Sequence, residues 1–293
     1  MASVSSFQTT REQYRSALKR FLDSPKDLEV ITSVARAGLD PSPPSEAHTQ
    51  GALYVLDSSF NPPTKAHKHI AGSAIVENWS KSVWGKPSRV LLLLATQNAD
   101  KPSKPASFED RLIMMQLCAK DLQKSMSSLV DDINCPVIDI GVTKKPYFVD
   151  KATAIESAGV YPSGLQQVHC TGYDTLIRIF NTKYYPPEHT LAPLERFLSK
   201  HKLRVTVRPD DHWGSQEQQE AYVEDLARGG RESEGGKREW AKQIEIVERS
   251  IVEKRPISST KAREAIQGNS QDLDWLVQPS VREFVLSQKP YSE

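Results

Sequence analysis

Apolar residues gather into short continuous runs that alternate with amphipathic segments along most of the chain. The runs at residues 52–56 and 90–95 predict strands that are covered on both faces. Further strands are predicted at residues 137–140, 203–209 and 243–247, with another strand before Gly172. Strands that alternate with helices are typical of α/β proteins. The pattern therefore predicts a doubly wound, Rossmann-like parallel sheet with helices on both faces.

The first 50 residues follow a different pattern. Thr10 is a candidate helix cap, followed by apolar residues on one helical face, and residues 27–37 are expected to form a second helix. Residues 40–45, Asp-Pro-Ser-Pro-Pro-Ser, are a linker-like break. We expect a helical N-terminal extension (1–50) and a main domain (51–293). The extension is a candidate docking surface for a protein partner.

One long polar segment near the C-terminal end also stands out. Residues 210–240 contain the pairs Gly229-Gly230 and Gly235-Gly236. Glycine pairs in a polar context indicate turns and loops, so we expect this segment to be mobile.

Composition limits the classes of function. The net charge is +1, which gives no general field for nucleic acid or for a membrane surface. The three cysteines, Cys118, Cys135 and Cys170, lack metal-ligand spacing, and their odd number fits a reducing compartment. No 18-residue apolar run and no N-terminal signal pattern is present. We expect a cytoplasmic protein, with a nuclear location also compatible, that binds neither nucleic acid nor membrane and has no protein metal site.

The segment 54–67, Tyr-Val-Leu-Asp-Ser-Ser-Phe-Asn-Pro-Pro-Thr-Lys-Ala-His, is the first that suggests chemistry. It predicts a buried strand, a tight polar loop and a helix capped by Thr64. Loop N–H groups and a helix N-terminus together favour a bound anion. His67 lies in the first helical turn and can donate a hydrogen bond to a phosphoryl oxygen. The alternative is a ligand-free loop with a surface histidine.

The segment 257–263, Ile-Ser-Ser-Thr-Lys-Ala-Arg, begins a second amphipathic helix. Its hydroxyl groups can satisfy the free N–H groups of the helix or bind phosphate. Arg263 lies one turn further and can form paired hydrogen bonds with phosphate oxygens. An ordinary N-cap is the alternative for this segment.

Together the two segments resemble the signatures of the nucleotidylyltransferase superfamily, Gly-Ser-Phe-Asn-Pro-x-Thr/His-x-x-His and Ile-Ser-Ser-Thr-x-x-Arg. The chain is most similar to the nicotinamide and nicotinate mononucleotide adenylyltransferases, over residues 50–290. A third segment, Gly172-Tyr173-Asp174-Thr175-Leu176, resembles the Gly-x-Asp-x-Leu of that family. Ser58 departs from the pattern, because the family has a glycine there that lets ATP approach the backbone.

The resemblance implies adenylyl transfer from ATP to nicotinamide or nicotinate mononucleotide, giving NAD or deamido-NAD and pyrophosphate. It implies Mg²⁺ held mainly by the ATP phosphates, and catalytic roles for His67, Thr64 and Arg263. The implied ATP-binding residues are Ser58, Ser59, Phe60, Asn61, His67, Gly172, Asp174, Ile257, Ser258, Ser259, Thr260 and Arg263. Asp174 is equally suited to capping the helix that follows it.

Candidates for the acceptor site are less closely matched. Lys101 and Lys104 follow the strand at 90–95, where ligands of open α/β sheets bind, although a solvated basic loop is the equal alternative. By resemblance, Tyr147 or Phe148 stacks on the pyridine ring, and Tyr184 and Tyr185 lie where the family has an apolar residue and a tryptophan. Aromatic faces suit a flat cationic ring, but core packing is the alternative for Tyr147 and Phe148.

A second class of function stays open from the sequence. The chain could be a non-synthetic nucleotide-binding protein on the same fold, either a slow ATPase or a partner-binding regulator. Transfer to another phosphorylated acceptor is a third option. Pyrophosphate release that depends on a mononucleotide separates the first class from the second.

Overall fold

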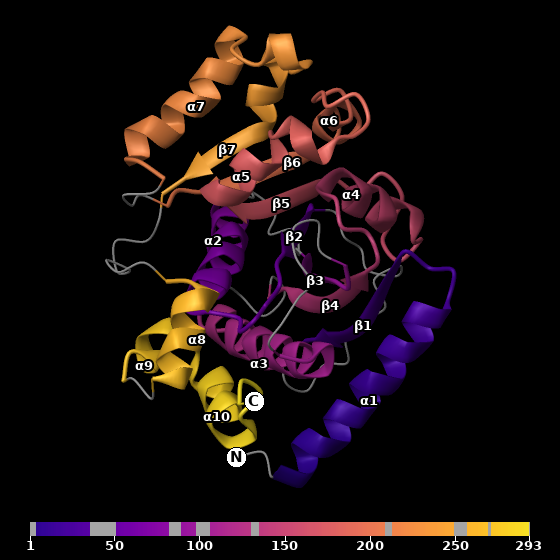
Figure 1. Ribbon diagram of the computed structural model, residues 1–293, viewed down its shortest axis with the longest axis vertical. Helices are drawn as coiled ribbons and strands as arrows, with labels where there is room; N and C mark the ends of the chain where they lie inside the picture. The colour runs from indigo at the N-terminus through magenta and orange to yellow at the C-terminus, as the bar shows by residue number, and fades with distance from the viewer. Residues whose placement is uncertain are drawn as a thin grey trace.

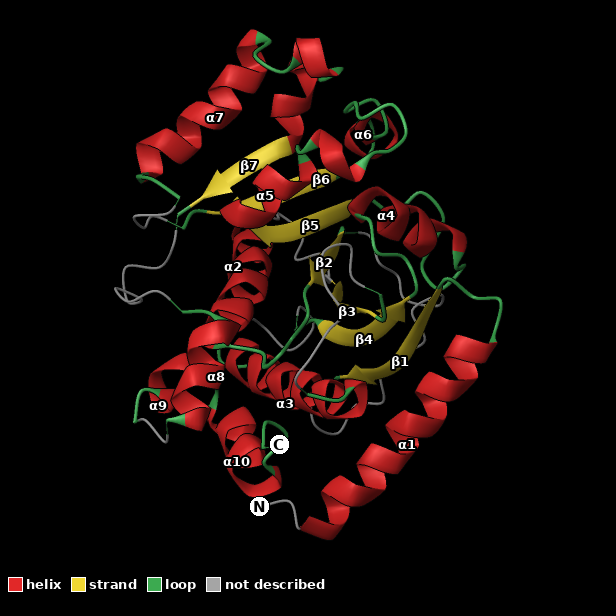
Figure 2. Cartoon of the chain, viewed as in Figure 1, coloured by secondary structure: helices red, strands yellow, loops and turns green. Residues whose placement is uncertain are grey.

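A computed structural model describes residues 4–35, 51–81, 89–97, 106–129, 135–208, 213–248, 257–268 and 271–292. Seven strands form one sheet in the order β1-β4-β3-β2-β5-β6-β7 (Figures 1 and 2). The strands are β1 (Leu28–Val34), β2 (Leu53–Asp57), β3 (Arg89–Ala95), β4 (Val137–Thr143), β5 (Gln167–Gly172), β6 (Lys202–Thr206) and β7 (Ile244–Val247).

Strands β2 to β7 are parallel to one another, and β1 pairs antiparallel with β4. The chain adds β3 and β4 on one side of β2 and then β5, β6 and β7 on the other. The strand order therefore reverses at β2, as in doubly wound folds, where ligands bind in the crevice at that point. The predicted fold class is confirmed.

Helices cover both faces of the sheet (Figure 2). They are α1 (Val4–Asp23), α2 (Lys65–Lys81), α3 (Phe108–Met126), α4 (Phe148–Ser157), α5 (Tyr173–Ile179), α6 (Leu194–Leu198), α7 (Gln216–Arg228), α8 (Ser259–Gln267), α9 (Leu273–Leu276) and α10 (Pro279–Gln288). Short 3₁₀ helices are η2 (Thr182–Tyr184), η3 (Glu232–Glu234) and η4 (Arg238–Gln243). No helix among the described residues has the length and apolar character needed to cross a membrane.

Alternation along β2 divides its side chains between the two faces. Tyr54 and Leu56 join the core cluster formed with α1, α2, α3 and α8–α10. Leu53 and Val55 join the cluster formed with α4. Successive side chains of a strand point to opposite faces, so Asp57 points toward α4 and Ser58 toward α2. The two faces consequently meet at the carboxyl end of this central strand.

The predicted second helix at residues 27–37 is wrong. Residues 28–34 form β1, an edge strand of the main sheet, with Leu28 and Val34 buried. Val30, Ile31 and Thr32 are β-branched, and such residues favour strands when a neighbouring edge is available for pairing. Local sequence does not show this strand, because its pairing partner, β4, lies more than 100 residues away.

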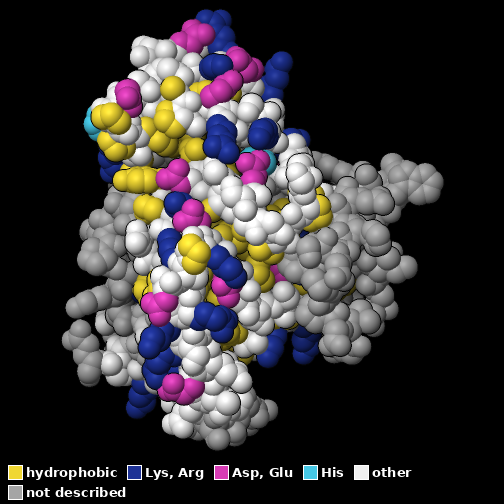
Figure 3. Space-filling model, turned by 90° about the vertical axis from the view of Figure 1, so that its right-hand side faces the viewer, with side chains coloured by type: hydrophobic (Ala, Val, Ile, Leu, Met, Phe, Trp, Pro, Cys, Tyr) yellow, Lys and Arg dark blue, Asp and Glu magenta, His cyan; other side chains and the backbone are white. Residues whose placement is uncertain are grey.

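Thr10 does not cap α1, which already begins at Val4. The Thr10 hydroxyl instead donates to the carbonyl of Ser6 within the helix, at 2.9 Å. Helix α1 packs on α3, and Arg11 contacts Asp110 there at 2.8 Å. Figure 3 shows the right-hand side of Figure 1, the side on which α1 lies, with basic and acidic side chains interspersed.

The segment 210–240 contains a helix that the sequence analysis missed. Ser215 and Gln218 form a reciprocal capping box at the start of α7. Gly229 and Gly235 have φ values of 97° and 86°, and they end α7 and η3 in the left-handed conformation that glycine adopts most easily. These glycines are therefore helix caps, and the described residues 213–240 contain the helices α7 and η3 and the start of η4.

A buried ion pair lies at the amino ends of β3 and β4. Both guanidinium N–H groups of Arg89 donate to Asp139, at 2.6 and 2.9 Å, and the two side chains are 3% and 0% exposed. Ser33 of β1 and Tyr161 donate to the same carboxylate, at 2.6 and 3.0 Å. The carboxylate thus ties the edge strand β1 to the centre of the sheet.

We predict that Asp139→Ala lowers the free energy of unfolding by about 3–5 kcal/mol, because it leaves the Arg89 charge buried without its partner. Urea denaturation measures this change. The matched control is Asp27→Ala, which removes the exposed Asp27–Lys145 pair (3.0 Å) and should cost at most about 1 kcal/mol. A similar cost for both variants would contradict the importance of the buried carboxylate.

Candidate functional site

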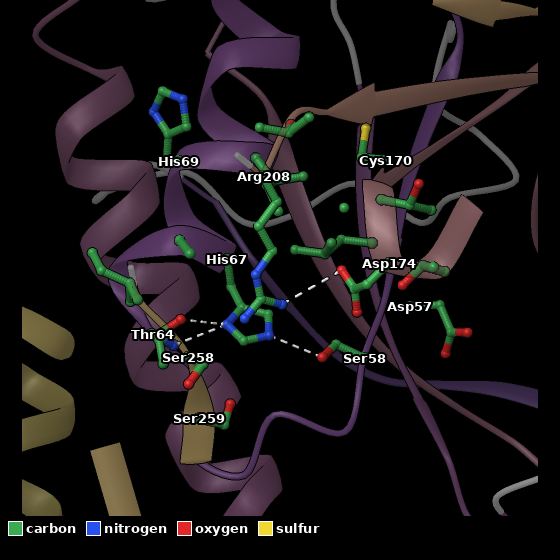
Figure 4. A pocket seen from close by; sticks show the side chains of 18 of the residues that line it. Asp57, Ser58, Thr64, His67, His69, Cys170, Asp174, Arg208, Ser258 and Ser259 are labelled. Carbon is green, nitrogen blue, oxygen red and sulfur yellow. Dashed lines mark hydrogen bonds and ion pairs between the residues drawn. The ribbon is translucent and has the colours of Figure 1, made fainter. Parts of the chain in front are cut away.

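A pocket opens at the carboxyl ends of β2, β5 and β6, where the strand order reverses (Figure 4). The N-termini of α2 and α8 border it, which brings together two segments that are about 190 residues apart in the sequence. Its lining is Leu56, Asp57, Ser58, Thr64, Ala66, His67, His69, Ile70, Cys170, Thr171, Gly172, Asp174, Thr175, Thr206, Val207, Arg208, Ile257, Ser258 and Ser259. Two helix N-termini facing one pocket favour a bound anion.

His67 is held on both ring nitrogens. Its Nδ1 accepts from the Thr64 backbone N–H at 3.0 Å and lies 2.8 Å from the Thr64 hydroxyl. Its Nε2 lies 2.9 Å from the Ser58 hydroxyl. Because a backbone N–H can only donate, Nδ1 carries no proton, and the neutral ring carries its proton on Nε2. The Nε2–H group is therefore aimed at the loop side of the pocket, where Ser58 accepts it.

Burial lowers the pKa of His67 to about 4. The charged imidazolium is disfavoured because little water reaches the ring, and because the bond from Thr64 N–H requires an unprotonated Nδ1. At neutral pH the ring is an uncharged hydrogen-bond donor with a fixed direction.

The start of α8 is hydrogen-bonded to the loop 58–64. Ser258 caps α8 by accepting from Lys261 N–H at 3.2 Å. Ser259 donates to the carbonyl of Pro62 at 2.8 Å, and Arg263 donates to the carbonyl of Asn61 at 2.7 Å. Both signature segments therefore form one hydrogen-bonded unit.

Some predicted ATP-binding residues lie behind the loop and outside the pocket lining. The Phe60 ring is fully buried, with its centroid 5.3 Å from that of His67, and Asn61 is 4% exposed. Phe60 has a φ of 45°, a left-handed backbone conformation that is uncommon outside glycine. The core holds this conformation, so the loop presents Ser58 and buries Phe60.

The third predicted segment lies across the pocket from His67. Gly172 precedes α5, and a Cβ at this position would lie 2.8 Å from the Asp174 carboxylate, so only glycine fits without movement. Asp174 lies 3.6 Å from Arg208 as an ion pair (Figure 4). The sequence analysis missed Arg208. Its position near the carboxyl end of the alternating segment at 203–209 was the available signal, because ligands bind at such carboxyl ends.

Asp57, Thr171 and Thr206 are further lining residues that the sequence analysis missed. Asp57 forms an ion pair with Lys151 of α4, at 2.5 Å. Thr171 and Thr206 are 4% and 6% exposed, and their hydroxyls find no hydrogen-bond partner among the described residues. Buried polar groups are normally hydrogen-bonded, so these two hydroxyls are open to a water molecule or to a polar ligand atom in the pocket.

The predicted catalytic and ATP-binding residues thus divide into two groups. Lining residues are Ser58, Thr64, His67, Gly172, Asp174, Ile257, Ser258 and Ser259. The others do not line the pocket and are Ser59, Phe60, Asn61, Thr260 and Arg263. Arg263 donates to the Asn61 carbonyl of the loop and, at 3.2 Å, to the Thr260 hydroxyl. Its predicted contact with phosphate would therefore use its remaining N–H groups.

None of the described acceptor candidates lines this pocket. Phe148 packs on His169 and Phe197, and the Tyr185 hydroxyl donates to the carbonyl of Ile179 at 2.6 Å inside the core. Tyr147 is the N-cap residue of α4, and Tyr184 lies in η2 beneath the ammonium group of Lys183. Lys101 and Lys104 lie outside the described residues.

The described residues contain no group of three or more His, Cys, Asp or Glu side chains placed to hold a metal ion. The two carboxylates that line the pocket each contact a cation, Asp57 with Lys151 and Asp174 with Arg208. Each of these carboxylates therefore already has a neighbouring cation that balances its charge.

The chain is related to a Schizosaccharomyces pombe protein, "Putative nicotinamide mononucleotide adenylyltransferase". They are 31% identical over 227 residues, which cover 78% of this chain and 80% of the relative. The chain belongs to the mononucleotide adenylyltransferase family of nucleotidylyltransferases. Membership in this family indicates adenylyl transfer as the general type of reaction. No family model matches the chain.

Solved structures of two mononucleotide adenylyltransferases are distantly similar. The Plasmodium falciparum nicotinic acid mononucleotide adenylyltransferase complexed with NaAD is 14% identical, with a TM-score of 0.46, over 81% of this chain and 96% of that one. A Vibrio parahaemolyticus "Putative Nicotinate-nucleotide Adenylyltransferase" is 13% identical, with a TM-score of 0.33, over 83% and 96%.

We predict that His67 stays neutral, with its proton on Nε2, when the nucleotide-free protein is titrated from pH 8 to pH 5. The reason is its lowered pKa of about 4. Long-range ¹⁵N–¹H correlation spectra measure the protonation state, and the signals are assigned by their loss in His67→Gln. Protonation with a midpoint near the ordinary pKa of about 6.5 would contradict the buried, Thr64-bound ring.

Proposed function

We propose that this protein transfers the adenylyl group of ATP to nicotinamide or nicotinate mononucleotide, forming NAD or deamido-NAD and pyrophosphate. The observation that carries the proposal is the convergence of the His67 Nε2–H group and two helix N-termini on one pocket at the reversal of strand order. The family relationship supports adenylyl transfer and leaves the acceptor to be proposed.

In the proposed reaction, a phosphate oxygen of the mononucleotide attacks the α-phosphorus of ATP. A new P–O bond forms, the bond to the β-phosphate oxygen breaks, and pyrophosphate leaves. No protein nucleophile is needed, so the protein acts by aligning two anions and by stabilising the charge that develops between them. His67 would donate to the α-phosphate oxygens, and Thr64 fixes the direction of that donor.

The start of α8 would receive the leaving pyrophosphate. Ser258 and Ser259 line the pocket on the side of the α2 N-terminus. A helix N-terminus favours negative charge most when the charge is close to the first turn. Asp174 and Arg208, across the pocket, would bind the nucleoside part of ATP.

Mg²⁺ would accompany ATP and lower the repulsion between the two reacting anions. The ion would be held by phosphate oxygens and water, because both lining carboxylates already contact cations. Lys101 and Lys104 remain predictions for the acceptor phosphate.

One observation favours the alternative of a slow ATPase or regulator. Ser58 occupies the Nε2–H donor of His67 at 2.9 Å. A phosphate must displace this hydroxyl before it can use the histidine, whereas a glycine at this position would leave the donor open.

Purified protein with ATP and Mg²⁺ tests the proposal directly. Pyrophosphate release is measured with nicotinamide mononucleotide, with nicotinate mononucleotide, with another phosphorylated acceptor, and with no acceptor. Release that requires a pyridine mononucleotide supports the synthetic function. Hydrolysis of ATP at the same rate without acceptor would support the ATPase alternative instead.

We predict that His67→Ala lowers the turnover rate roughly 10²- to 10³-fold and leaves ATP affinity nearly unchanged, because the lost hydrogen bond strengthens as charge develops in the transition state. Steady-state rates and calorimetric titration with ATP separate the two effects. The control is His189→Asn at an exposed position with a φ of 51°, which asparagine tolerates. Near-normal turnover in His67→Ala would rule out the catalytic role.

A further inference from the structure

The pocket has a second polar surface on the face of the sheet opposite to α2. Val55 of β2 pairs with His169 of β5, so Asp57 at the end of β2 and Thr171, the next-to-last residue of β5, lie on one face of the sheet. Residues of this face pack on α4, as shown by Gln167, which donates to the carbonyl of Ala152 at 3.1 Å. Figure 4 shows Asp57 on the far side of Ser58 from His67. The phosphate-binding groups and Asp57 therefore occupy opposite sides of the central strand.

This second surface carries a largely buried ion pair and one hydroxyl group without a hydrogen-bond partner among the described residues. The Lys151 ammonium group contacts one carboxylate oxygen of Asp57 at 2.5 Å, and the two side chains are 9% and 17% exposed. Asp57 lines the pocket and Lys151 does not, so a ligand meets the carboxylate first. The Thr171 hydroxyl beside it is 4% exposed and has no partner among the described residues. The carboxylate can accept a hydrogen bond, and the neighbouring hydroxyl can donate one. This pair therefore suits a ligand group that has both an N–H donor and an oxygen acceptor.

We propose that Asp57, supported by Lys151, and Thr171 form the site that recognises the base of the acceptor and that they select a carboxamide over a carboxylate. This inference rests on the proposed function. The carboxamide NH₂ group would donate to Asp57, and its carbonyl oxygen would accept from the Thr171 hydroxyl. A base with a carboxylate offers no N–H donor and places a second negative charge beside Asp57.

The topology supports this assignment. A dinucleotide product needs two nucleotide-binding halves, and doubly wound sheets provide them on the two sides of the point where the strand order reverses. His67, Ser258 and Ser259 lie on the α2 and α8 side. The α4 side holds Asp57 and Thr171, and Tyr147 is one turn from Lys151, whose backbone N–H donates to the Tyr147 carbonyl at 3.1 Å. The opposite charges of Asp57 and Lys151 cancel, so this surface also suits an uncharged amide.

The test compares kcat/KM for nicotinamide mononucleotide with kcat/KM for nicotinate mononucleotide. Wild-type protein should prefer the amide. Asp57→Asn should reduce that preference by about 10-fold or more, the value of one hydrogen bond to a charged group. Thr171→Val should lower kcat/KM for both acceptors and keep their ratio, because the hydroxyl donates to an oxygen that both bases possess. The KM for ATP should stay within about twofold in both variants.

Asp150→Asn is the matched control, because Asp150 is an exposed carboxylate on the same helix, next to Lys151 in the sequence. It should leave the acceptor ratio unchanged. A wild-type preference for the acid, or an equal loss for both acceptors in Asp57→Asn with ATP binding intact, would overturn the proposal. Activity with neither mononucleotide would overturn the proposed function as well, which distinguishes the two failures.

Discussion

The site depends on hydrogen bonds that the C-terminal segment, residues 259–278, donates to the loop after the central strand. The carbonyls of Asn61 and Pro62 accept from Arg263 and Ser259, and the Thr64 carbonyl accepts from Gln278 at 2.9 Å. Buried carbonyls without donors would be costly, so the loop conformation requires the C-terminal segment to be in place. These bonds hold two helix N-termini at one pocket, although the segments are about 190 residues apart.

The central strand then separates two kinds of recognition. On the α2 side, burial keeps His67 uncharged and Thr64 fixes its donor, so the site can respond to charge that develops on a phosphate. On the α4 side, the Asp57–Lys151 ion pair gives a polar surface with no net charge. In the reaction that we propose, a single crevice would supply electrostatic stabilisation on one side and hydrogen-bond selection on the other.

Strands β2 to β7 and the three motifs could be predicted from the sequence because they are local. Continuous apolar runs mark buried parallel strands, and Ser258 caps its helix within three residues. Strand β1 and the ion pair of Asp57 could not be predicted in this way, since β4 and Lys151 lie about 100 residues from them. Helix α7, in the polar segment before β7, was missed because glycines that are typical of loops also end helices, as Gly229 does.

The central claim is that His67 and the α8 N-terminus bind the phosphates of one nucleotide. A crystal structure of the protein with a non-hydrolysable ATP analogue and Mg²⁺ tests it most directly. The account predicts a phosphate oxygen about 3 Å from His67 Nε2, with the Ser58 hydroxyl displaced and the terminal phosphates at Ser258 and Ser259. Phosphates bound elsewhere, with the Ser58–His67 hydrogen bond intact, would contradict it.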